Sequence, residues 1–163
     1  MATIRDCDSC GASCSVKIEN GLDFYDRISS ELKIYSTGIE EVDNAIDGGI
    51  WTGEVTEIVG PVASGKTQLC YSLLSSVLLK STDLRVVYLD HNGSFRPRRL
   101  CQYLRSEEEH LLSRLLIARP GCPNELVERL RKTKRMAGEK NVRMLIVDNV
   151  GCQLASTVLS GEE

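Results

Sequence analysis

The segment from Gly60 to Thr67 constrains this chain more than any other, because it reads G-x-x-x-x-G-K-T, the phosphate-binding loop of nucleoside triphosphate-binding proteins. The predicted loop consists of Gly60, Pro61, Val62, Ala63, Ser64, Gly65, Lys66 and Thr67. Lys66 is expected to reach the outer phosphates, and the Thr67 hydroxyl is expected to ligate Mg²⁺. Backbone N–H groups at the start of the next helix would point at phosphate oxygens, although Pro61 supplies no N–H.

The residues on either side of this loop argue against a chance match. Residues 54–59, before the loop, alternate polar and β-branched apolar side chains, which predicts a buried strand. Residues 68–80, after the loop, carry apolar side chains at helical spacing. A strand, a glycine-containing loop and a helix in this order indicate a nucleotide-binding site.

Strands and helices are predicted to alternate through the rest of the chain. Further strands are expected over residues 85–90, 115–119 and 142–148, and helices start near residues 97 and 123. This alternation predicts an α/β fold with a parallel sheet and helices on both of its faces.

Asp90 and Asp148 each end one of the predicted strands. Ligands in parallel α/β sheets lie at the carboxyl ends of the strands, so we expect both carboxylates to converge on the phosphate-binding loop. An aspartate at the end of a buried strand orients Mg²⁺ next to the loop threonine in phosphate-loop enzymes. Upstream of the loop, a short helix is predicted with Thr37 as its N-cap and Glu40 completing a capping box.

The composition is that of a globular protein rather than a disordered chain, with 42% apolar and 26% charged residues among 163. The net charge of −3 argues against a surface that binds nucleic acid throughout, although a local basic patch on the helix after residue 123 remains open. Apolar runs are too short to span a bilayer, so no membrane association is expected. Polar residues follow Met1 without a secretory signal, which predicts a cytosolic or nuclear location.

The seven cysteines are expected to be free thiols rather than a disulfide framework. Cys70 and Cys101 fall within helical patterns and are interpreted as small core residues. Cys7, Cys10 and Cys14 offer three of the four ligands of a tetrahedral zinc site, and the alternative is a reduced, mobile tail.

Several further motifs stand in a specific order around the loop. Ser36 to Ile39, Gly48-Gly49 and residues 52–57 precede it, and a segment containing Asn92, Phe95-Arg96-Pro97 and Arg99 follows the second predicted strand. This order resembles the ATPase core of the RecA-type recombinases of eukaryotes and archaea. Within that family the chain is similar to the D-type subfamily of recombinase paralogues in homologous-recombination DNA repair, over roughly residues 22–163.

The resemblance implies a P-loop NTPase (RecA-like) core that binds ATP and Mg²⁺, with Asp148 beside Thr67 at the metal and Arg99 near the adenine. It also implies a nuclear location and other recombinase paralogues as partners in a hetero-oligomeric complex, which would reach single-stranded DNA. The expected organisation is a flexible leader over residues 1–20, an amphipathic linker over 21–36 and a partial RecA-like core over 37–163, incomplete at its C-terminal end. Such an incomplete sheet is expected to expose a strand edge.

Asn92 departs from the family pattern. Active recombinases carry a glutamate at the matching position, where it activates or orients the attacking water, and an amide cannot accept a proton as a carboxylate can. The prediction is therefore an ATP-binding subunit with weak or slow hydrolysis and no assigned catalytic residue, unless Asp90 takes over the role. Two alternatives remain: an interaction module that keeps the loop as a scaffold, and an active DNA-dependent ATPase. Small-molecule kinases share the loop but not the Phe95-Arg96-Pro97 signature.

Overall fold

The computed structural model describes residues 18–104, 109–139 and 141–151. Cys7, Cys10 and Cys14, and therefore the zinc-site question, lie outside the described residues, as does most of the expected leader. None of the described helices is long and apolar enough to cross a membrane.

The centre of the molecule is a parallel three-stranded sheet in the order β4-β3-β5. Its strands are β3 (Arg85–Asp90), β4 (Leu115–Ala118) and β5 (Val142–Asp148), which confirms the predicted positions of these strands to within one residue. Because β3 is central, five of its six residues are buried. In the described part of the chain, β4 and β5 each have a neighbouring strand on one side only.

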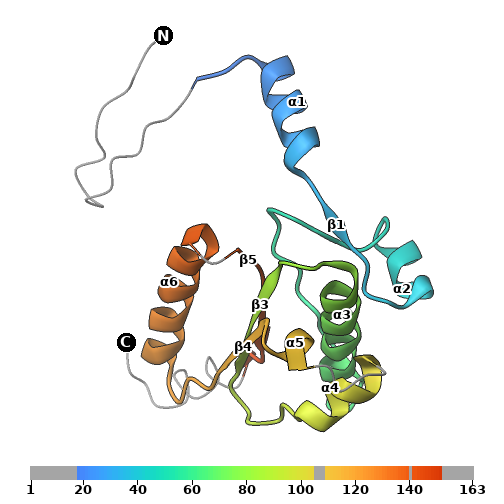
Figure 1. Ribbon diagram of the computed structural model, residues 1–163, viewed down its shortest axis with the longest axis vertical. Coiled ribbons are helices and arrows are strands. Elements are labelled where there is room, and N and C mark those ends of the chain that lie inside the picture. The colour runs from blue at the N-terminus through green and yellow to red at the C-terminus, as the bar shows by residue number, and fades with distance from the viewer. Residues whose placement is uncertain (1–17, 105–108, 140, 152–163) are drawn as a thin grey trace.

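Helices cover both faces of this sheet, as the alternating pattern predicted (Figure 1). On one face lie α3 (Lys66–Lys80), α4 (Pro97–Leu104) and the short α5 (Glu109–Leu112), and on the other lies α6 (Pro123–Glu139). The core on the first side includes Leu74, Leu78 and Tyr88, and the smaller core on the second side includes Leu126. Since α3 is buried from Cys70 to Leu78, it is the main packing element of the fold.

The cysteines of the helices are core residues in different degrees. Cys70 is buried and Cys101 is half-buried, and both are free thiols. Burial raises the pKa of Cys70 to about 11, and the nearby Asp148 carboxylate adds to this shift. Cys70 is therefore protonated and unreactive at neutral pH.

A smaller and more exposed unit precedes the sheet. It contains α1 (Gly21–Glu31), β1 (Ile34–Tyr35), α2 (Glu40–Ala45) and β2 (Ile50–Trp51), with β1 and β2 paired in an antiparallel hairpin. Helix α1 extends away from the sheet in Figure 1, and none of its residues is buried. Its N-cap is Asn20, whose side-chain oxygen accepts a hydrogen bond from the Asp23 N–H.

The prediction of a buried strand over residues 54–59 was wrong. The segment has no regular secondary structure, and Val55 and Val59 are 100% and 80% exposed. Only Ile58 packs against the main core. The alternating pattern was present, but no described strand pairs with the segment, and a strand without a hydrogen-bonded neighbour does not form a ladder.

The capping box predicted at Thr37 was also wrong. The N-cap of α2 is Ile39, and it makes no side-chain capping hydrogen bond. Thr37 is instead buried, and its hydroxyl donates to the Asp43 carboxylate at 2.7 Å. Ser36 donates to the other oxygen of the same carboxylate, also at 2.7 Å. A carboxylate one turn into the helix therefore competed successfully for the hydroxyl.

Candidate functional site

The phosphate-binding loop runs directly into the N-terminus of α3. Gly65 is the N-cap residue with φ of 91°, a left-handed conformation that glycine adopts without a steric penalty, and no side chain caps this helix end. A Cβ added at Gly60 would lie 2.7 Å from Ser64 Oγ, so a larger residue there would displace the Ser64 side chain. Gly65 is thus needed for the shape of the loop, and the helix N-terminus is available for an anionic ligand.

The Lys66 ammonium group lies over this loop. Its Nζ donates to the carbonyl oxygens of Gly60 at 2.8 Å and Pro61 at 2.7 Å. These contacts fold the side chain back over the first two residues of the motif, where its positive charge faces the turn.

The two residues predicted to hold Mg²⁺ are in contact, although 81 positions separate them. Thr67 Oγ1 donates to Asp148 Oδ2 at 2.8 Å. Thr67 lies in the first turn of α3, and Asp148 is the last residue of β5. Asp148 is only 8% exposed. Hydroxyl and carboxylate oxygens are ligands of the kind that Mg²⁺ takes, so the chemistry of this pair fits the metal.

Tyr88 is a third member of this cluster that sequence reasoning missed. Its side chain is fully buried, and its hydroxyl donates to Asp148 Oδ2 at 2.7 Å. Tyr88 pairs with Ile146 in the parallel ladder, two residues before Asp148, so both side chains lie on the face that α3 covers. Burial raises the pKa of the Tyr88 phenol, and the bond to Asp148 raises it further, so it acts as a donor. The only sequence signal for this contact is that Tyr88 lies two residues before Asp90, which places both side chains on the same face of the strand.

Asp90 lies next to Asp148 in the register but serves the following loop instead. Its carboxylate is fully buried and accepts from the N–H groups of Ser94 at 2.9 Å and Phe95 at 3.1 Å. It also forms an ion pair with Arg119 at 3.1 Å. With three donors, this carboxylate holds the loop in shape, which argues against Asp90 as the substitute for a catalytic glutamate.

Asn92 is exposed on the loop that Asp90 supports. Within the described residues, no hydrogen bond joins it to Lys66, Thr67 or Asp148. The structure therefore brings together the loop, Thr67 and Asp148, and leaves Asn92 on the surface without a hydrogen bond to Lys66, Thr67 or Asp148 among the described residues.

Arg99 reaches the start of α3 from the neighbouring helix α4. Its Nε donates to Gln68 Oε1 at 2.9 Å, and its guanidinium lies 5.2 Å from the centre of the Tyr103 ring. The Tyr103 hydroxyl donates to the same Gln68 oxygen at 3.1 Å. Arg99 thus contacts Gln68, the residue that directly follows the phosphate-binding loop, and Gln68 and Tyr103, which the sequence did not single out, set its orientation.

The parallel sheet, the glycine loop at a helix N-terminus and the strand-end aspartate define the RecA-like class of P-loop fold. The family model described as Rad51 matches residues 28–161. The chain belongs to the Rad51 family. The names of its relatives support the interpretation that it is a recombinase paralogue.

Among these relatives is the mouse protein named DNA repair protein RAD51 homolog 4, which is 33% identical over 156 residues, or 88% of this chain and 47% of the relative. The bovine protein of the same name is 31% identical over 88% of this chain and 47% of its own length. DNA repair protein RAD51 homolog 2 from Arabidopsis thaliana is 28% identical over 99% of this chain and 44% of its own length. The chain spans about half the length of the curated relatives it matches.

Proposed function

We propose that this chain is an ATP-binding recombinase-paralogue subunit that acts in homologous-recombination DNA repair in the nucleus. The observation that carries the nucleotide part is the contact between Thr67 and Asp148, because it joins the loop threonine to a strand-end carboxylate that is distant in sequence. The repair role rests on membership in the Rad51 family and on the names of the relatives.

Each residue of the cluster has a role in this proposal. Residues 60–67 and the uncapped N-terminus of α3 would hold the phosphates, with Lys66 turning from the loop carbonyls toward them. Thr67 and Asp148 would hold Mg²⁺, which neutralises charge on the phosphates when it is bound. Arg99 would lie near the adenine, in the orientation that Gln68 and Tyr103 give it.

Binding of ATP tests the site directly. A fluorescent ATP analogue titrated with Mg²⁺ should bind the native chain, and Lys66→Ala should reduce its affinity at least about tenfold, since the phosphate charge loses its partner. Lys132→Ala removes an exposed lysine of α6 and serves as the matched control. Equal affinity of the native chain and the Lys66→Ala variant would refute the site assignment.

Slow hydrolysis is the second part of the proposal. Asn92 stands where a glutamate would activate water, and the nearest strand-end carboxylate, Asp90, is occupied by three donors. Turnover by the native chain should be low, and Asn92→Glu should raise it, because it restores a carboxylate that can activate water. Asn92 is exposed, so the larger side chain is tolerated sterically. A rate that stays negligible in Asn92→Glu would contradict the view that Asn92 limits hydrolysis. Strong stimulation of the native chain by single-stranded DNA would instead favour an active ATPase.

An interaction module that is indifferent to nucleotide is the second candidate, and the exposure of α1 favours it. Leu22, Phe24 and Tyr25 are all at least half exposed on this helix. In both candidates the partners are other recombinase paralogues in a hetero-oligomeric complex, through which single-stranded DNA would be reached. Co-purification with and without Lys66→Ala separates the two: loss of partners supports the ATP-dependent subunit, and unchanged partners support the module.

A further inference from the structure

The stretch of chain from the β1–β2 hairpin to the phosphate-binding loop is strongly acidic. Between residues 34 and 65 there are six of the chain's 23 acidic residues and none of its 20 lysines and arginines. The six are Glu40, Glu41, Asp43, Asp47, Glu54 and Glu57. Five of them are exposed, so this part of the surface attracts cations.

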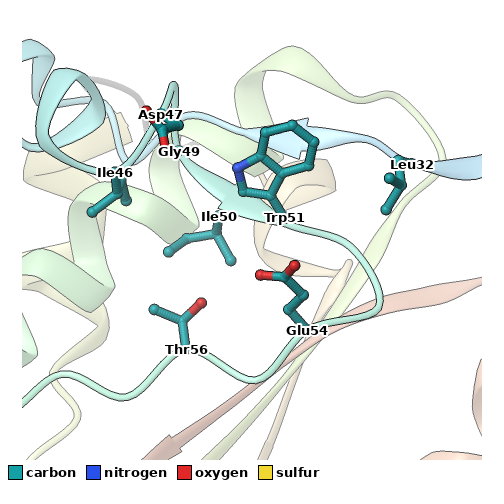
Figure 2. Close-up of a pocket in the computed structure, with 8 residues that line it drawn as sticks. All are labelled: Leu32, Ile46, Asp47, Gly49, Ile50, Trp51, Glu54 and Thr56. Atoms are coloured by element: carbon teal, nitrogen blue, oxygen red, sulfur yellow. The ribbon is translucent and has the colours of Figure 1, made fainter. Parts of the chain in front are cut away.

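An open cavity of about 440 Å³ lies within this acidic unit. Figure 2 shows Trp51, Glu54, Ile50 and Ile46 among the residues that line it, with Asp47 farther along its edge. None of the residues that line it belongs to the phosphate-binding loop. The cavity is therefore separate from the nucleotide site.

The polar groups of this cavity are available to a ligand. Within the described part of the chain, neither Glu54 nor Asp47 has a hydrogen-bond or ion-pair partner, and both are exposed. Trp51 is half-buried at the end of β2, and it is the only tryptophan of the chain. A half-buried indole beside an unpaired carboxylate can accept both a stacked ring and a positive charge.

The lining selects one class of side chain. A guanidinium is planar, stacks on an indole and donates two hydrogen bonds to a carboxylate, while its methylene stem suits apolar walls such as Ile46 and Ile50. An ammonium group pairs as a point charge and stacks less well, and an anion is repelled by Asp47 and Glu54. Trp and Arg are also the residue types enriched where protein interfaces hold most of their binding energy.

We propose that this cavity receives an arginine side chain from a basic segment of a partner protein chain. The guanidinium stacks on Trp51 and pairs with Glu54, and the surrounding acidic residues attract the rest of the basic segment. This docking does not depend on nucleotide, so Lys66→Ala leaves it unchanged, and its failure is distinguishable from failure of the proposed ATP site.

Fluorescence of the single tryptophan measures occupancy of the cavity. The probe is a short acetylated and amidated peptide of alanine and leucine with a central arginine, titrated into the full chain. A second peptide carries citrulline in place of arginine, which keeps the shape and removes the charge. The arginine peptide should change the Trp51 emission in a saturable way, and the citrulline peptide should bind about tenfold more weakly.

Two variants with the same change of charge locate the binding. Glu54→Gln should weaken the arginine peptide about five- to tenfold, because it removes the paired carboxylate. Glu57→Gln lies outside the cavity lining and should change the affinity less than about twofold, by general screening alone. Equal loss in both variants, or equal binding of both peptides, would overturn the proposal. Trp51 emission that depends on protein concentration without peptide would also overturn it, because the occupant would then be a second copy of this chain.

Discussion

Two segments of this chain carry strand-like sequence patterns, but only one of them forms a strand. Residues 85–90 form β3, where Val86 and Val87 are 0% and 5% exposed, whereas residues 54–59 form no strand and leave Val55 fully exposed. The difference is neighbours: β3 lies between β4 and β5, and residues 54–59 pair with nothing in the described chain. A pattern rich in β-branched residues makes a strand possible, but the strand forms only where neighbouring strands hydrogen-bond to it.

The largest effect is expected from truncating the central strand. Val86→Ala removes two buried methyl groups between the sheet and its helices and should lower the free energy of unfolding by about 2–3 kcal/mol. Urea unfolding followed by circular dichroism measures this change. A loss below about 0.5 kcal/mol would mean that β3 is not the packed centre of the fold.

A smaller effect is expected where β3 supports the site. Tyr88→Phe removes the hydroxyl that donates to Asp148 and should cost about 1 kcal/mol of unfolding free energy. It should also raise the Mg²⁺ concentration needed for nucleotide binding, since Asp148 loses one of its two donors.

The matched control for this variant is Tyr71→Phe. Tyr71 is also buried, but its hydroxyl accepts from the Arg96 N–H and does not contact Asp148. Its loss should lower stability by a similar amount without changing the Mg²⁺ dependence. If both variants shift the Mg²⁺ titration equally, Tyr88 has only a packing role.

The Asp43 carboxylate anchors the exposed hairpin unit through hydrogen bonds from Ser36 and Thr37. Burial opposes its ionisation, but hydrogen bonds from Ser36 and Thr37 outweigh burial, and Lys80 adds a favourable charge, so the pKa of Asp43 is lowered from its usual 3.8. A lowered carboxyl pKa stabilises the folded state above the unfolded pKa, and that stabilisation is lost as the pH falls through the folded pKa.

Asp43→Asn should therefore cost roughly 1 kcal/mol at neutral pH, because charged acceptors form the stronger hydrogen bonds. The difference between the native chain and the variant should shrink as the pH falls below about 4, where the native carboxyl becomes protonated. Urea unfolding at pH 7 and at a series of acidic values measures both. A difference that does not change with pH would contradict ionisation as its cause.

The smallest effect is expected in the unpaired segment. Val55→Lys replaces a fully exposed side chain and should change the unfolding free energy by less than about 0.5 kcal/mol. The same measurement as for Val86→Ala applies. A cost above about 2 kcal/mol would show that residues 54–59 are buried in solution and would remove the contrast with β3.

Much of the fold was predictable because the apolar residues of the relevant elements face the core. β3, β5 and α3 were predicted to within two residues, since their apolar patterns match the faces that the core covers. Residues 54–59 and the Thr37 cap were not predictable in the same way. The first depended on a partner strand, and the second on competition between a helix N–H and the Asp43 carboxylate.

The sequence by itself determined that a glycine loop leads into a helix and that Asp148 ends a parallel strand, because motif spacing and apolar periodicity are local properties. Only the tertiary structure decided that Thr67 contacts Asp148, that Tyr88 supports the same carboxylate and that Trp51 and Glu54 share a cavity. These contacts depend on the register between β3 and β5 and on the hairpin geometry. Register and packing are set by interactions between residues distant in the chain, which no local pattern encodes.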